Sequence, residues 1–267
     1  MIKLIASDVD GTLIKDSTPD LYPEMAETIR ELTKRGILFC AASGRQYESL
    51  RNVFRDVADE IAYIAENGAH IRYQNQNISV TPMKREHIEG IITMLRPYYG
   101  ECETITSTPN GSLVESRNED FVNLITYGYH NAFRRVEDVL KVDDTIIKIA
   151  VYRKGSIRKL GESLFIPKWQ DKVKACMAGE EWVDFMDSSV DKGNGLKILE
   201  NHLKISRQET MVFGDNDNDI GMMRAAGYSY AVDTAVDEVK QAAGGICPGY
   251  KQKGVYQIIR KEVLFHA

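Results

Sequence analysis

The sequence lacks the features that mark membrane, secreted and nucleic-acid-binding proteins. Its 267 residues contain no apolar run near the ~18 residues that a membrane span needs. Asp8 interrupts the first apolar stretch too early for a signal peptide. The net charge is −5 at pH 7, and no basic stripe with interleaved aromatic residues is present. We therefore expect a cytoplasmic protein that binds neither membranes nor nucleic acid.

Cysteine is also scarce. The four residues, Cys40, Cys102, Cys176 and Cys247, are scattered and form no C-x-x-C pair. Reduced thiols in a cytosolic protein explain this pattern. What the chain does have is 43% hydrophobic residues, enough to bury a full core as one large domain or two small ones.

An acidic pair ends the first apolar run, residues 2–6. The stretch Asp8-Val9-Asp10-Gly11-Thr12-Leu13 places two carboxylates two residues apart, so that on an extended chain both face one side. Gly11 allows a tight turn, in which Thr12 can hydrogen-bond locally. Adjacent carboxylates repel each other unless a cation or a shared proton holds them. The spacing fits a metal site, an acid/base pair, or a nucleophile beside a proton carrier.

Three further polar clusters lie next to apolar segments in the same way. The apolar run 37–42 ends in Ser43-Gly44-Arg45, and the run 210–213 ends in Gly214-Asp215-Asn216-Asp217-Asn218-Asp219. Between them, Asp191-Lys192-Gly193-Asn194-Gly195 opens a segment with leucines at helical spacing. Ligands of open α/β sheets bind outside the carboxyl ends of the strands, which is where these clusters would lie.

The order of these motifs resembles the haloacid dehalogenase-like (HAD) superfamily of phosphohydrolases. The finer match of DVDGTL, SGR, ENGA, DKGNGL and GDNDND is similar to its Cof-type subfamily. The resemblance is specific within residues 1–81 and 187–267 and implies an α/β fold whose core is a Rossmann-like parallel sheet. Residues 82–186 would form an inserted α+β cap that determines substrate specificity.

Strand and helix signals agree with this organisation. In the core, Pro23 opens a helix that Gly36 follows, and residues 61–65 and 228–232 predict further buried strands. In the middle segment, the pattern predicts a helix at 88–95, a hairpin of 104–108 with 112–115, a helix at 156–164, and strands at 146–152, 173–178 and 182–186.

The resemblance also implies a role for each candidate residue. Asp8 attacks phosphorus to form an aspartyl phosphate, and Asp10 protonates the leaving oxygen and later takes a proton from water. The phosphoryl group or substrate is contacted by Ser43, Gly44, Lys192 and Asn218. Mg²⁺ is bound by Asp8, the Asp10 carbonyl and Asp215, while Asp219 orients a metal-bound water without binding the ion directly.

We therefore expect a Mg²⁺-dependent phosphatase of small phosphomonoesters, such as sugar phosphates, acting as a monomer or weak dimer. Two alternatives stay open: a phosphomutase on the same fold, and a receiver-type domain that only accepts phosphate. The chain departs from the family pattern at Asp233-Thr234 and at Pro248-Gly249-Tyr250, and these departures bear on substrate fit more than on hydrolysis. Arg45 fits a surface helix start as well as it fits the site.

Overall fold

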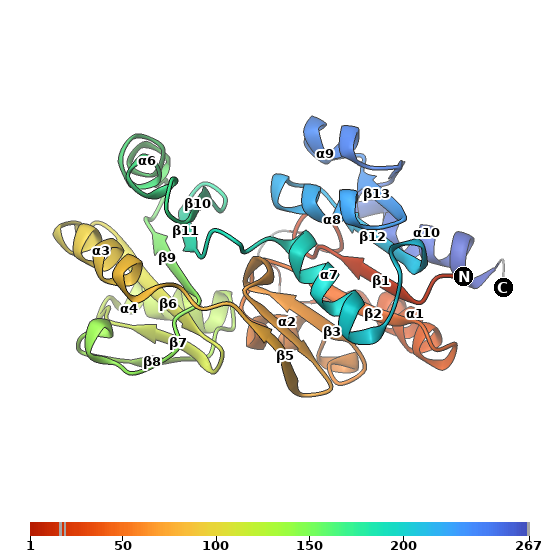
Figure 1. The fold of residues 1–267 in the computed structure, drawn as a ribbon, viewed down its shortest axis with the longest axis horizontal. Coiled ribbons are helices and arrows are strands. Elements are labelled where there is room, and N and C mark those ends of the chain that lie inside the picture. Colours follow the sequence, from red (N-terminus) through yellow and green to blue (C-terminus); the bar gives the residue numbers. More distant parts are fainter. Residues whose placement is uncertain (16–17, 19, 266–267) are drawn as a thin grey trace. The chain divides into compact units, whose positions relative to one another are not determined.

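The computed structural model describes residues 1–15, 18 and 20–265, and these form two compact units. Unit 1 combines Met1–Ser79 with Asp191–Ala267, and unit 2 is Val80–Val190. Unit 2 is thus inserted into the sequence of unit 1 (Figure 1). Each unit has its own sheet and its own apolar core.

Unit 1 is built on an eight-stranded sheet in the order β14-β13-β12-β1-β2-β3-β4-β5. Its strands are β1 (Leu4–Ser7), β2 (Leu38–Ala42), β3 (Ala62–Ala65), β4 (His70–Tyr73), β5 (Gln76–Val80), β12 (Thr210–Gly214), β13 (Tyr228–Val232) and β14 (Gly245–Cys247). Neighbours from β14 to β3 pair in parallel, whereas β4 runs antiparallel to β3. The predicted α/β fold with a parallel sheet is therefore confirmed.

Burial explains why the central strands were readable from the sequence. Every residue of β1, β3 and β12 is buried, because parallel strands covered on both faces need apolar side chains at each position. By contrast, β5 is exposed or half-buried along its length and contains polar residues. No apolar run marks β4, β5 or β14, and none of them was predicted.

The helices of unit 1 are α1 (Pro23–Lys34), α2 (Tyr47–Val53), α7 (Lys192–Leu203), α8 (Ile220–Ala225), α9 (Asp237–Ala242) and α10 (Gly254–Ile258). In α1, Pro23 occupies the first turn, where a missing N–H costs nothing, and Met25, Ile29 and Leu32 are fully buried on one face. The predicted helix start is thus confirmed. α7 contacts both β3 and α8.

Unit 2 contains a six-stranded sheet in the order β10-β11-β9-β6-β7-β8. Its strands are β6 (Glu103–Thr108), β7 (Gly111–Val114), β8 (Phe133–Arg135), β9 (Lys148–Tyr152), β10 (Lys174–Met177) and β11 (Trp182–Met186). All pairs are antiparallel except β7 with β8. The predicted hairpin is confirmed as β6 and β7, which pair directly around Pro109-Asn110.

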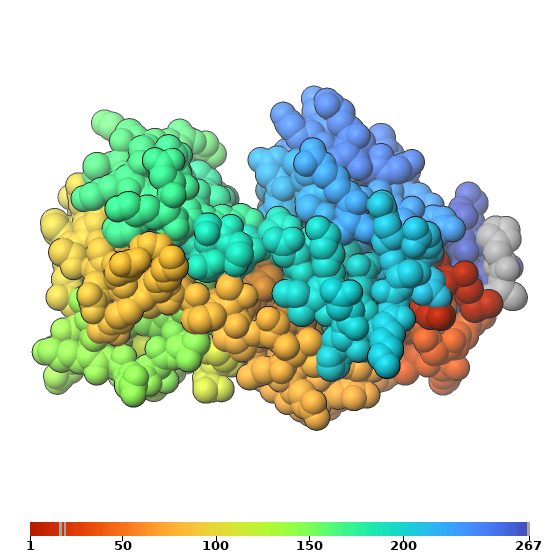
Figure 2. Space-filling model, viewed as in Figure 1, coloured from red at the N-terminus to blue at the C-terminus, as the bar shows by residue number. Residues whose placement is uncertain are grey.

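The helices of unit 2 are α3 (Arg85–Leu95), α4 (Glu119–Asn123), α5 (Arg158–Leu160) and α6 (Ile166–Trp169). The helix expected at 156–164 instead begins at Arg158 and continues beyond Leu164, because a π-helical turn joins α5 to α6. Apolar side chains form a buried core in each unit, and Figure 2 shows the outer surface in the same view as Figure 1. In the described part of the chain, no helix has the length and apolar character that crossing a membrane requires.

Candidate active site

Asp8 directly follows β1 at the centre of the unit 1 sheet. Its backbone N–H donates to the carbonyl of Phe213 at 3.0 Å, which extends the parallel pairing of β1 with β12. Asp215 directly follows β12. Since the two strands are parallel neighbours, both aspartates leave the sheet at the same edge.

Lys192 joins two of the candidate aspartates. It is the first residue of α7 and is fully buried. Its Nζ donates to Asp8 Oδ1 at 2.6 Å and to Asp219 Oδ1 at 2.7 Å. Burial alone disfavours a charged amine, but the two carboxylates outweigh it and raise the pKa of Lys192. The lysine therefore supplies a fixed positive charge at the site.

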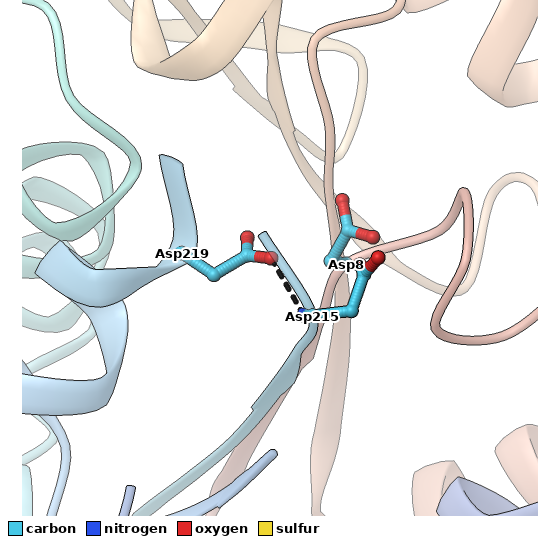
Figure 3. Close-up of side chains that lie close together, drawn as sticks. All are labelled: Asp8, Asp215 and Asp219. Atoms are coloured by element: carbon cyan, nitrogen blue, oxygen red, sulfur yellow. Dashed lines mark hydrogen bonds between the residues drawn. The ribbon is translucent and has the colours of Figure 1, made fainter. Parts of the chain in front are cut away.

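Asp219 is held by donors on both of its oxygens. While Lys192 occupies Oδ1, the backbone N–H groups of Asp215 and Asn216 donate to Oδ2 at 2.9 and 3.1 Å. Figure 3 shows the bond from the Asp215 backbone, with the Asp8 side chain nearby. Asp219 thus fixes the loop that carries Asp215.

Asp215 also contacts the turn that follows Asp8. Thr12 Oγ1 donates to Asp215 Oδ1 at 2.8 Å, so the expectation that Thr12 bonds within its own turn is wrong. Gly11 has a φ of +82°, and a Cβ added to it would lie 2.4 Å from Asp215 Oδ2. Glycine is needed here both for the left-handed backbone and for the close approach of the carboxylate.

Burial and the closeness of the acidic groups raise the pKa values of Asp8 and Asp215. Burial raises the pKa of Asp8, and Asp219 and Asp215 raise it further against the pull of Lys192. Burial, followed by the charge of Asp219, raises the pKa of Asp215 to about 6. An added cation would lower both pKa values, because it would stabilise the ionised carboxylates.

The cluster fits a divalent metal ion on chemical grounds. Oxygen atoms of Asp8, Asp215 and Asp219 all lie within 4.8 Å of one another. Among the described residues, Asp8 Oδ2 is a buried oxygen without a hydrogen-bond partner. Three carboxylates face one ammonium, and a set of oxygen donors of this kind suits a hard cation such as Mg²⁺.

Asp10 lies in the turn after Asp8 and is paired with Arg45. The guanidinium donates from Nε to Asp10 Oδ2 at 2.8 Å and from a terminal nitrogen to Oδ1 at 2.5 Å. The same side chain donates to the carbonyl of Thr18 at 3.1 Å and is only 9% exposed. Arg45 is therefore part of the site, and the reading of it as a surface residue is wrong.

Asn67 contacts three of the candidate residues, Ser43, Gly44 and Asn218. The carbonyl of Ser43 accepts from the backbone N–H of Asn67 at 2.9 Å, and Asn218 Nδ2 donates to Asn67 Oδ1 at 2.9 Å. The Asn67 amide also lies against Gly44. In the sequence, Asn67 lies in the ENGA motif after a buried strand, where the pattern predicts a turn and does not identify a site residue.

The two departures from the family pattern lie together. A Cβ added to Gly249 would lie 3.0 Å from Asp233 Oδ1 and 3.3 Å from Thr234 Oγ1. Asp233 also donates its backbone N–H to the carbonyl of Cys247 at 2.8 Å. The replacements at the two positions are thus neighbours in space, so each provides part of the other's surroundings.

Comparisons with known proteins were made for the whole chain. The model of the haloacid dehalogenase-like hydrolase family matches residues 5–259. The 5-amino-6-(5-phospho-D-ribitylamino)uracil phosphatase YbjI of Escherichia coli (strain K12) is 28% identical, over 99% of this chain and 97% of its own. A crystal structure from Eubacterium rectale is 33% identical, with a TM-score of 0.87 over 98% of this chain and 99% of that one. The structure of TM0651 from Thermotoga maritima is 23% identical with a TM-score of 0.84, covers 98% of this chain and 97% of that one, and shows the likeness of the fold.

Proposed function

The chain belongs to the haloacid dehalogenase-like hydrolase family, and from this premise we propose that it is a Mg²⁺-dependent phosphatase. Its substrates are small phosphomonoesters, such as sugar phosphates, which it hydrolyses through an aspartyl phosphate on Asp8. One observation carries the proposal: buried Lys192 joins Asp8 to Asp219, beside Asp215. A relative named as a phosphatase supports it over nearly the full length of both chains.

The anionic oxygens of a phosphate ester repel a nucleophile, so catalysis requires neutralised charge and fixed positions. Lys192 supplies a positive charge at a fixed position, because its side chain is buried and donates to two carboxylates. Asp8 attacks phosphorus, and the leaving alkoxide departs as the aspartyl phosphate forms. The Ser43 hydroxyl and the backbone N–H of Gly44 bind the phosphoryl oxygens.

Asp10 transfers the protons in this scheme. It protonates the leaving oxygen and then takes a proton from the water that hydrolyses the aspartyl phosphate. In the structure both of its oxygens accept hydrogen bonds from Arg45. Each of these oxygens keeps a second lone pair, which can carry the transferred proton while Arg45 holds the carboxyl group in place.

Magnesium would be held by the carboxylates of Asp8 and Asp215 together with the Asp10 carbonyl. When bound, the ion offsets the charge that the phosphoryl oxygens carry. Asp219 stays out of this set in our proposal, because both of its oxygens are already used by Lys192 and by backbone N–H groups.

We further propose that residues 82–186 determine which ester is accepted. All the chemistry assigned above comes from unit 1, while unit 2 folds around cores of its own. Substitutions on the unit 2 surface should therefore change the ranking of phosphate esters by kcat/KM. An unchanged ranking across well-folded unit 2 variants would remove this role.

The proposal is tested with purified protein stripped by EDTA and then supplied with Mg²⁺. We expect it to release inorganic phosphate from p-nitrophenyl phosphate, or from a panel of sugar phosphates, nucleotides, FMN and pyridoxal phosphate, only when the ion is present. Full activity after exhaustive EDTA treatment would remove the metal from the scheme. An isomerised sugar phosphate without released phosphate would identify a phosphomutase instead, and a stable phosphoprotein would identify a receiver-type domain.

Two broader expectations accompany this proposal. A cytoplasmic location agrees with the four cysteines, which are all free thiols. A monomer or weak dimer stays a prediction, which sedimentation of the purified protein can test.

A further inference from the structure

The turn between β3 and β4 has a backbone conformation that the scheme above does not explain. Glu66 and Asn67 follow one another with positive φ angles of 50° and 57°. Both residues are buried, with exposures of 1% and 5%. Residues other than glycine seldom adopt the left-handed backbone region, because it is strained for them. The surrounding contacts must therefore offset this strain, and strained residues of this kind are common at functional sites.

The backbone of this turn holds the loop that follows β2. The N–H of Asn67 donates to the carbonyl of Ser43 at 2.9 Å, and the N–H of Glu66 donates to the carbonyl of Arg45 at 3.0 Å. Both bonds run to the stretch that binds phosphate in the proposed function. The left-handed conformation is what directs these two successive N–H groups toward that loop.

The side chain of Asn67 reaches a third loop. Its Oδ1 accepts from Nδ2 of Asn218 at 2.9 Å, in the loop after β12. Its amide also borders Gly44, since a Cβ built on Gly44 would lie 3.2 Å from Nδ2 and 3.3 Å from Oδ1. Asn67 thus connects the ends of β2, β3 and β12.

We propose that Asn67 is a positioning residue that fixes the Ser43-Gly44 backbone and the Asn218 amide for the phosphoryl group. This inference rests on the proposed function and assigns a role to the ENGA motif. Asparagine suits the place because it tolerates the left-handed region better than most residues and carries a donor and an acceptor on one short side chain. It acts through the neighbouring groups without itself touching the reacting atoms.

The test removes the amide while keeping the backbone. Asn67→Gly retains the left-handed conformation and the N–H bond to Ser43, and loses only the side chain. We expect kcat/KM for p-nitrophenyl phosphate to fall about tenfold, and the Kd for inorganic phosphate with Mg²⁺, from calorimetry, to rise about tenfold. The matched control is Asn75→Gly, an exposed asparagine with a φ of 59° outside the site, and it should change neither quantity.

A second variant tests the contact from its other end. Asn218→Ala should also lower kcat/KM, and the double variant Asn67→Gly/Asn218→Ala should lose clearly less than the product of the two single losses, because either single substitution already removes the bond between them. A role in folding alone would instead lower the melting temperature and leave kcat/KM and phosphate affinity unchanged.

The outcomes separate the two proposals. If the parent protein hydrolyses esters and Asn67→Gly stays within twofold of Asn75→Gly in both measurements, the positioning role is overturned. Losses that multiply in the double variant would also overturn it, since the residues would then act independently. If the parent hydrolyses nothing but Asn67→Gly still weakens phosphate binding, the proposed function fails while the positioning role stands. If the parent neither hydrolyses esters nor binds phosphate, both proposals fail.

Discussion

Replacing Lys192 with methionine keeps the length of a buried side chain and removes its charge. Asp8 and Asp219 would then lose the ammonium that donates to them at 2.6 and 2.7 Å. Breaking a buried ion pair by removing one partner typically costs about 3–5 kcal/mol, because a charge is left buried without compensation. We expect Lys192→Met to lose stability of about this size at pH 7, where the remaining carboxylates are less protonated than at pH 5.

The loss should shrink in two conditions. Acidification to pH 5 lets the crowded carboxylates protonate, since burial and their neighbours already raise the pKa of Asp8 and of Asp215. Added Mg²⁺ should restore part of the stability, because it would supply positive charge to the same oxygens. Urea unfolding of parent and variant at both pH values, with and without the ion, measures these effects.

Turnover should fall much further than stability explains. Lys192 acts on the charge of the phosphoryl group in every substrate, so kcat of the folded variant should drop about 10²-fold or more for all esters alike. If Lys192→Met stayed within about 1 kcal/mol of the parent at pH 7 and within tenfold in kcat, the reasoning from the buried charge would be refuted.

Three further changes test separate parts of the site and fold. Asp8→Asn keeps the shape and removes the nucleophile, so turnover should vanish with the fold intact, and a remaining tenth of kcat would exclude nucleophilic catalysis by Asp8. Gly11→Ala puts a Cβ 2.4 Å from Asp215 Oδ2, at a backbone φ of +82°. It should therefore lower the stability by about 1–3 kcal/mol and weaken Mg²⁺ binding, as measured by calorimetric titration. An unchanged Mg²⁺ affinity would contradict this. Burial lowers the pKa of His70, so the unfolded chain takes up a proton more readily below its ordinary pKa of 6.5, and stability is lost as pH falls. His70→Gln should therefore lose less stability than the parent between pH 7 and pH 5, and equal losses in urea unfolding would count against it.

The strands and helices that could be predicted from the sequence are those whose formation depends on residues close together in the chain. Residues 37–42 and 61–65 read as strands because parallel strands buried on both faces require apolar side chains throughout. The start of α1 follows from Pro23 and from apolar side chains at helical spacing. The candidate site could be located for the same reason, since polar clusters that follow such strands come to one edge of a parallel sheet.

The partners within that site depended on the tertiary structure. Thr12 bonds to Asp215, 203 positions away, because the sheet order places β1 directly beside β12. Arg45 pairs with Asp10, and Asn67 with Asn218, through side chains whose direction depends on turns that no periodic pattern describes. The spacing of residues along a strand predicts which end of the sheet they reach. Which donor forms a hydrogen bond with which carboxylate depends on the assembled sheet, because only the order of the strands and the packing of the loops at their ends bring these distant segments into contact.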